Sequence, residues 1–103
     1  MAVDLSILFS MSLEFDWDSE KSRTNLQKHG VSFIEAASAL SDPFSITQYD
    51  SIHSIEEDRF ITIGYSDRQR LLIVVHTERE TFIRIISARP ATSKEKKLYE
   101  QDS

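Results

Sequence analysis

The 103-residue sequence contains no cysteine, only two glycines and two prolines, and a single tryptophan. Without cysteine the chain has no disulfide, no thiol nucleophile and no cysteine ligand for zinc. It also lacks a glycine-rich phosphate loop and the G-x-S-x-G and H-E-x-x-H signatures of hydrolases. No apolar run reaches the roughly 18–20 residues that cross a membrane, and the apolar first nine residues lack the basic start of a signal peptide. The sequence therefore predicts a cytoplasmic protein with no membrane contact and, at this length, no bound cofactor.

Charge is unevenly distributed along a chain whose composition is otherwise that of one small globular domain. Hydrophobic residues make up 40% of the sequence and aromatic residues 10%, which is enough for a core. Residues 1–58 hold three Lys or Arg against eleven Asp or Glu, a net charge of −8; residues 59–103 hold nine against six, a net charge of +3, and the sum is −5. The basic half suits a local anion site or an acidic protein partner, and charge alone does not decide between them.

Capping residues and hydrophobic alternation predict the order of helices and strands. Asp18 and Gly30 bound a first helix, and Ser32 with Glu35 forms a capping box that opens a second helix ending before Pro43. A second capping box, Thr92 with Glu95, opens a last helix. Alternating apolar residues predict strands over 13–17, 44–49, 59–65, 71–77 and 82–88. The order indicates an α+β fold in which two N-terminal helices and one C-terminal helix pack on an antiparallel sheet.

The last two predicted strands carry the residues with the most informative chemistry. A three-residue turn over 78–80 places His76 opposite Phe82 and puts Arg84 on the same sheet face as His76. Arg89 then falls on the other face unless a bulge intervenes. A histidine beside arginines suits RNA cleavage without a metal ion, since imidazole transfers protons near neutral pH and guanidinium groups match phosphate oxygens.

Structural interpretations compete with each of these assignments. From spacing alone, His76 is better explained as a hydrogen-bonded core histidine, and Arg84 as the ion-pair partner of Glu78 or Glu80, because structural ion pairs imitate functional sites. His53 and Glu56 lie in a polar loop and are interpreted as surface residues, so that no metal site is expected.

The basic ends of two helices allow a structural and a functional interpretation. Lys28 and His29 suit a helix C-terminus because cations interact favourably with the helix dipole. Lys94, Lys96 and Lys97 are either a solvated helix face or a contact to an RNA backbone. Tyr99 either packs in the core or stacks on a base.

Two groups of residues together resemble the BrnT family of toxins and frame residues 13–100. The opening group is Phe15-Asp-Trp-Asp18, Lys21, Asn25, Lys28-His-Gly-Val31 and Phe33. The closing group is Val75-His-Thr77, Arg84-Ile-Ile-Ser-Ala-Arg89, Ala91 and Glu95. Members of this family begin near the first group, so we expect residues 1–12 to be an N-terminal extension and residues 13–103 to be a single toxin domain.

The resemblance implies a RelE-like fold and the ribonuclease toxin of a bacterial type II toxin–antitoxin system. Such a toxin cleaves RNA, free or on the ribosome, without a metal, and thereby inhibits translation. Its expected partner is a DNA-binding BrnA-type antitoxin in a complex of two toxins and two antitoxins, which contacts operator DNA only through the antitoxin.

Site residues follow from the same resemblance. Arg89 is the first candidate, as a cation that binds phosphate or stabilises the transition state, followed by Arg84 and His76 as catalytic residues. The expected RNA-binding residues are Lys28, His29, Arg59 and Lys94.

Two alternatives to an active toxin remain open at this stage. One is a catalytically weak relative that binds its antitoxin as a corepressor, with its basic groups paired to carboxylates. The other is an adaptor that pairs with another chain through its apolar N-terminal segment. Convergence of His76, Arg84 and Arg89 in one exposed concavity would favour the ribonuclease.

Overall fold

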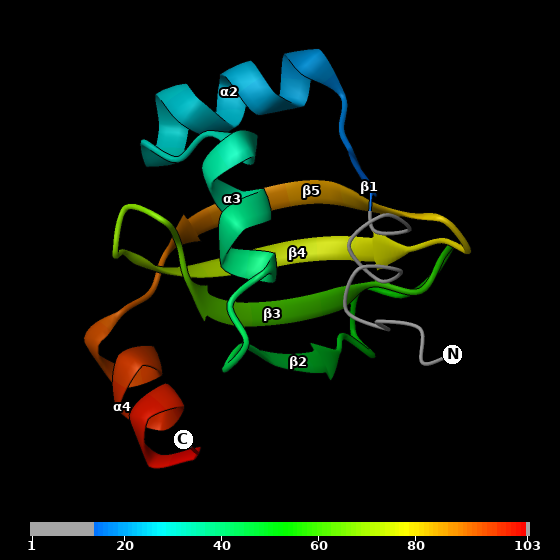
Figure 1. Cartoon of the computed structure of the whole chain (residues 1–103). Helices are drawn as coiled ribbons and strands as arrows, with labels where there is room; N and C mark the ends of the chain where they lie inside the picture. The colour runs from blue at the N-terminus through cyan, green and yellow to red at the C-terminus, as the bar shows by residue number, and fades with distance from the viewer. Residues whose placement is uncertain (1–13, 103) are drawn as a thin grey trace, which may run out of the picture.

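The computed structural model describes residues 14–102, which form three helices and one five-stranded sheet (Figure 1). In chain order the elements are β1 (Glu14–Asp16), α2 (Ser19–His29), α3 (Phe33–Leu40), β2 (Ile46–Tyr49), β3 (Phe60–Tyr65), β4 (Leu71–Glu78), β5 (Phe82–Pro90) and α4 (Ser93–Asp102). The predicted order is confirmed, and β5 continues two residues beyond its predicted end. The expected extension over residues 1–12 lies outside the described residues.

The predicted helix caps are present as expected. The Asp18 side chain accepts a backbone N–H from the first turn of α2, and Gly30 ends that helix with a φ of 70° while its N–H bonds to the Leu26 carbonyl. A left-handed residue at this position favours glycine. The Ser32 hydroxyl accepts the Glu35 N–H at 3.0 Å at the start of α3. Helix boundaries therefore follow from local hydrogen bonding.

The sheet is mixed, so the prediction of an antiparallel sheet is wrong at one edge. The strand order is β1-β5-β4-β3-β2, with β2 to β5 antiparallel to their neighbours. β1 runs parallel to β5, and Glu14 lies opposite Phe82. These two strands are joined by most of the chain rather than by a hairpin, and local turn rules do not set their direction.

The hairpin between β4 and β5 differs from the predicted register by three residues. Its turn covers residues 79–81, where the Arg79 N–H donates to the Phe82 carbonyl at 2.8 Å. His76 therefore lies opposite Ile85 rather than Phe82. Because side chains alternate along a strand, Arg84 is on the face opposite His76, and the predicted shared face is wrong.

A β-bulge at Ile86 then changes the phase of β5. Val75 lies opposite Ser87 while His76 lies opposite Ile85, which leaves Ile86 without a partner in β4. Arg84 and Arg89 are five residues apart and would occupy opposite faces of a regular strand. The extra residue places Arg84, Ser87 and Arg89 on one face.

The two faces of the sheet carry different neighbours. Helix α3 covers one face, where it contacts β3, β4 and β5, whereas α2 contacts β5 and α3 at the edge of the sheet; Figure 1 shows α3 lying across the strands and α2 beyond β5. The core between α3 and the sheet consists of Val31, Phe33, Ala36, Ala39, Leu72, Val74, Ile85 and Ala88. We call the opposite face the arginine face; it carries Ile61, Ile63, Ile73, Arg84, Ser87 and Arg89.

Gly64 allows α3 to approach β3 closely. A Cβ atom at Gly64 would lie 2.5 Å from the Ala39 carbonyl oxygen and 3.1 Å from the Ser45 Cβ. Any other residue at this position would push the end of α3 away from the sheet.

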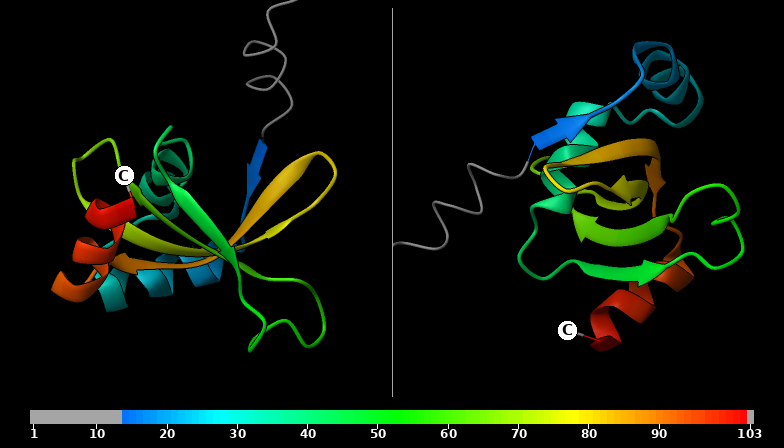
Figure 2. Two further views of the ribbon diagram at one scale, coloured as in Figure 1. Left: turned by 90° about the horizontal axis from the view of Figure 1, so that it is seen from below. Right: turned by 90° about the vertical axis from the view of Figure 1, so that its right-hand side faces the viewer.

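Helix α4 and the longest loop lie at opposite ends of the sheet (Figures 1 and 2). The loop over residues 50–59 is joined to the β4–β5 turn by an ion pair of 2.6 Å between Glu57 and Arg79. Within it, exposed His53 bonds to Asp50 at 2.9 Å. None of the helices within residues 14–102 is long and apolar enough to span a membrane.

Candidate functional site

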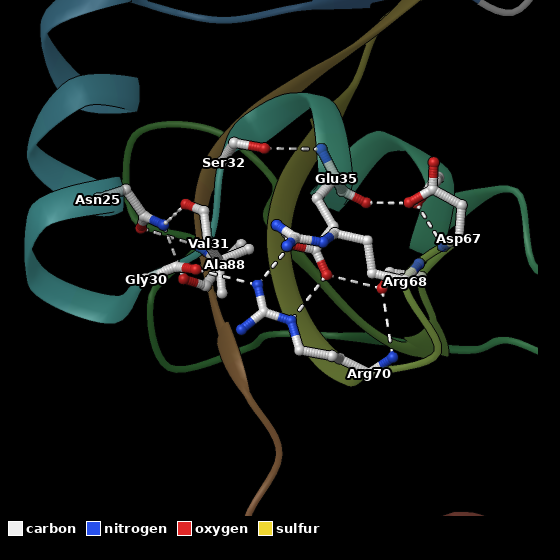
Figure 3. Close-up of polar contacts among 11 residues, drawn as sticks. Asn25, Gly30, Val31, Ser32, Glu35, Asp67, Arg68, Arg70 and Ala88 are labelled. Carbon is white, nitrogen blue, oxygen red and sulfur yellow. Dashed lines mark hydrogen bonds and ion pairs between the residues drawn. The ribbon is translucent and has the colours of Figure 1, made fainter.

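One buried side chain joins the N-terminal helix α2 to the last strand, β5. The Asn25 amide in α2 donates to the carbonyls of Val31 and Ala88 at 2.9 and 2.8 Å, and its oxygen accepts the Ala88 N–H at 3.1 Å (Figure 3). β1 pairs only with residues 82–84 of β5, so Asn25 takes the place of a neighbouring strand farther along that edge. This contact brings the end of α2 beside the bulge in β5.

A shallow depression of about 300 Å³ lies between α2 and the bulge, and it is lined by two lysines and a histidine together with Glu20. Lys21 and Lys28 are seven residues apart, which places them on the same stripe of the helix. His29 completes the helix side, and Ile86 and Ser87 form the strand side. Within residues 14–102 neither lysine makes an ion pair. The structure thus brings the predicted residues Lys28 and His29 to β5, where Lys21 joins them.

Arg84 lies on the arginine face near the other end of this depression. It forms an ion pair of 2.7 Å with Asp16 of β1, not with a carboxylate of the turn at 79–81. A hydrogen bond from the Lys21 backbone lowers the pKa of Asp18, and the charges of Lys21 and Arg84 act in the same direction. Lys21 and Arg84 therefore contribute to one electrostatic environment.

Arg89 is held by Glu95 of α4 in a two-pronged ion pair. Both guanidinium–carboxylate distances are 2.8 Å. These bonds lower the pKa of Glu95 to about 2 and raise the pKa of Arg89, so both groups remain charged at neutral pH. The Glu95 carboxylate also accepts the Thr92 N–H at 2.8 Å, which completes the predicted capping box. The Arg89 side chain keeps 41% of its surface exposed in a fixed orientation.

His76 does not join the arginines. It is 1% exposed on the helix-covered face, where its Nε2 is 2.7 Å from the Thr62 hydroxyl and its ring stacks on Phe60. Burial lowers the pKa of His76 to about 4, so the ring is neutral at pH 7. The expected convergence of His76 with Arg84 and Arg89 is therefore wrong, because the hairpin register places them on opposite faces.

The remaining predicted residues are scattered. Arg59 is the last residue of the loop over residues 50–59, directly before β3, and lines a depression with other residues of that loop. Lys94 is exposed in the first turn of α4. Tyr99 is buried, with its hydroxyl donating to Asp42 at 3.0 Å and its ring in edge contact with Tyr65. Among the described residues no three His, Asp or Glu side chains are grouped to hold a metal ion.

An ion pair between buried Glu35 and half-buried Arg70, which sequence analysis missed, fixes the start of α3. Arg70 donates through Nε to the Glu35 carboxylate at 2.9 Å and through Nη2 to the Gly30 carbonyl at 2.9 Å (Figure 3). The Ser66 hydroxyl donates to Glu35 at 2.7 Å, and the Arg70 bond lowers the pKa of Glu35. The only sequence signal was the capping box, in which a glutamate normally bonds back to the helix start. Here it ties the β3–β4 turn to both helices.

Comparison with known proteins gives a family and a fold. A family model described as "Ribonuclease toxin, BrnT, of type II toxin-antitoxin system" matches residues 17–95. The crystal structure of the Brucella abortus ribonuclease toxin BrnT superposes with a TM-score of 0.58 at 24% identity, over 79% of this chain and 99% of that one. No curated protein sequence matches significantly. Because the family model spans most of the chain, from Trp17 just after β1 to the first turn of α4, this protein belongs to the BrnT family of ribonuclease toxins of type II toxin–antitoxin systems.

Proposed function

We propose that this chain is an endoribonuclease that cleaves single-stranded RNA without a metal ion, at a site built around β5. The observation that carries the proposal is the bulge at Ile86, which puts Arg84, Ser87 and Arg89 on one face. The two arginines lie opposite residues four apart in β4, so their Cα atoms are about 13 Å apart along the sheet. A guanidinium group is always charged and binds phosphate oxygens in pairs. The arginines are thus placed to hold phosphates at separate points of one RNA strand.

The chemistry of this cleavage needs a stabilising cation and a group that transfers protons. The 2′-hydroxyl loses its proton as it attacks the phosphorus, and the bond from phosphorus to the 5′-oxygen breaks as that oxygen gains a proton. Arg89 stabilises the negative charge that develops on the phosphate. His76 is buried and neutral, and we assign proton transfer to His29, which lies beside Lys28 in the depression next to Ser87. Lys21 and Lys28 bind the backbone on the α2 side.

The partner and the cellular effect follow from family membership. A toxin of a type II system has an antitoxin partner. We infer that this partner is a DNA-binding protein of the BrnA type, in a complex of two toxins and two antitoxins. We further infer that the fold is RelE-like and that RNA cleavage stops translation in the cytoplasm.

Induced expression in bacteria tests the proposal. We expect growth arrest with the wild type, relief on co-expression of the neighbouring gene, and at least a hundredfold gain in surviving colonies with Arg89→Ala. Arg79→Ala is the matched control, since Arg79 has similar exposure and is also ion-paired, but lies at the far end of the sheet. RNA cleavage by purified protein in excess EDTA tests metal independence. Equal toxicity of Arg89→Ala and wild type would refute the site.

A second function is favoured by one observation. Arg84 and Arg89 are both paired to carboxylates, Asp16 and Glu95, as expected for a toxin relative that has become a corepressor. In that case folded protein leaves RNA intact yet increases operator binding by its antitoxin. RNA cleavage by the purified chain would exclude this alternative.

A further inference from the structure

An apolar groove of about 270 Å³ lies on the arginine face between α4 and β2. Its walls are branched aliphatic side chains from three strands and the helix. They are Ile46, Ile61, Ile63, Ile73 and Leu98. Leu98 is 56% exposed even though it points along this groove, so the described part of the chain leaves the groove accessible.

Three polar or aromatic groups also line the groove. Gln48 of the edge strand β2 contributes an amide, which both donates and accepts hydrogen bonds. Glu95 contributes a carboxylate from α4, and Tyr99 contributes an aromatic ring. Apolar walls with a few polar groups are typical of sites for small planar ligands.

Glu95 makes the groove continuous with Arg89. Its carboxylate holds the Arg89 guanidinium through two bonds of 2.8 Å while also lining the groove. Ile73, another lining residue, lies directly opposite Arg89 in the β4–β5 ladder. A ligand in the groove is therefore next to a half-exposed, permanently charged arginine.

We propose that the groove holds one unstacked base of the RNA substrate while Arg89 binds an adjacent phosphate. This inference rests on the proposed function and adds to it the recognition of a base. Proteins that read single-stranded RNA place splayed bases between apolar or aromatic side chains and bond to their edges. An apolar peptide would fill the same walls but would bring no anion to the exposed part of the Arg89 guanidinium. The combination of an apolar groove and a fixed cation beside it fits a nucleotide better.

The polar lining also predicts which bases bind. Glu95 is ionised and can only accept hydrogen bonds. Adenine, cytosine and guanine carry an exocyclic amino donor. Uracil offers only its ring N3–H, which lies between two carbonyl oxygens that would face the same carboxylate. We therefore expect the groove to favour amino-bearing bases over uracil by about three- to tenfold, which is what one hydrogen bond contributes.

The test is NMR titration of the full-length chain with the four nucleoside 5′-monophosphates. We expect shifts in the backbone amides of residues 61–63 and 73, with UMP binding three- to tenfold more weakly than the others. Ile63→Phe fills the groove and should weaken AMP binding at least tenfold. Gln48→Leu should alter the order of affinities, whereas the control Gln27→Leu, on the exposed side of α2, should leave it unchanged.

The outcomes separate this inference from the proposed function. Base-dependent shifts in the groove that Ile63→Phe abolishes support the inference. Shifts confined to residues 21–29, or shifts in the groove only with peptides of the antitoxin, overturn it even if the chain cleaves RNA. Cleavage of RNA is measured separately: a folded wild type that binds nucleotides in the groove but leaves RNA intact refutes the nuclease and not the groove.

Discussion

The buried amide of Asn25 gives the sharpest test of how the fold positions β5. In the variant Asn25→Asp, an oxygen replaces the Nδ2 atom that donates to the Val31 and Ala88 carbonyls at 2.9 and 2.8 Å. The side chain keeps its size, so no cavity forms. Both carbonyls then lack a donor and face a negatively charged oxygen.

The magnitude follows from these two lost bonds. A buried polar group without a partner costs about 1–3 kcal/mol, so the two carbonyls together cost about 2–6 kcal/mol. For a domain of this size, each kcal/mol lowers Tm by about 4–8 °C, and the expected decrease is at least about 8 °C at pH 7. Burial beside two carbonyls raises the pKa of the introduced carboxyl in the folded state. The difference in unfolding free energy between wild type and variant therefore becomes smaller as pH falls from 7 toward 4, where the introduced carboxyl of the unfolded chain is also protonated.

Thermal and urea unfolding followed by circular dichroism measure the effect. Gln27→Glu is the matched control, because it makes the same chemical change on an exposed position of the same helix and should cost less than about 1 kcal/mol. If Asn25→Asp loses no more stability than Gln27→Glu, or loses the same amount at pH 4 and pH 7, the assigned role of this amide is incorrect.

Three further predictions concern stability. The pKa of His76 is about 4 in the folded state and 6.5 in the unfolded chain, so the unfolded chain takes up the proton first as pH falls. The free energy of unfolding should therefore fall by about 3 kcal/mol from pH 6.5 to 4, and urea titration of His76→Gln should show a smaller fall over this range. Gly64→Ala brings a Cβ atom against the backbone of α3 and should lower the free energy of unfolding by about 2–3 kcal/mol. Gly30→Ala has space for the Cβ atom but a φ of 70°, and should cost about 1 kcal/mol; equal shifts of the urea midpoint in the two variants would contradict this order. Glu35→Gln removes the buried charge that Arg70 and Ser66 bind and should cost about 1–3 kcal/mol, because Arg70 is itself one-third exposed. Glu57→Gln at an exposed pair should cost under about 1 kcal/mol in the same denaturation assay.

Local chemistry made the helices and most strands predictable. The Ser32 cap and the Gly30 stop each depend on residues within one turn, and the sequence contains both partners. The β-branched runs likewise mark β3 and β4, although each strand shifted by one residue at an end. Contacts within a few residues carry this information without the rest of the fold.

Features that depend on distant residues were not predictable. The direction of β1 depends on where β5 returns after 66 residues, and the partner of Arg84 became Asp16 for that reason. The position of the β4–β5 turn and the bulge at Ile86 decide which face of the sheet His76 and Arg89 occupy. A shift of one residue at either place moves every following side chain to the other face. Arginine and histidine were therefore identified as informative residue types, while their grouping required the fold.

Because of the bulge, β5 can lose one residue without losing its pairing with β4. If Ile86 were deleted, Ser87 would follow Ile85 directly, the ladder with β4 would become regular, and Arg84 and Arg89 would still project to the same side. One inserted residue between these arginines has no such accommodation and would turn one of them toward the helix layer. Related chains are thus free to be one residue shorter here, and a gap in their alignment at this point is compatible with an intact arginine face.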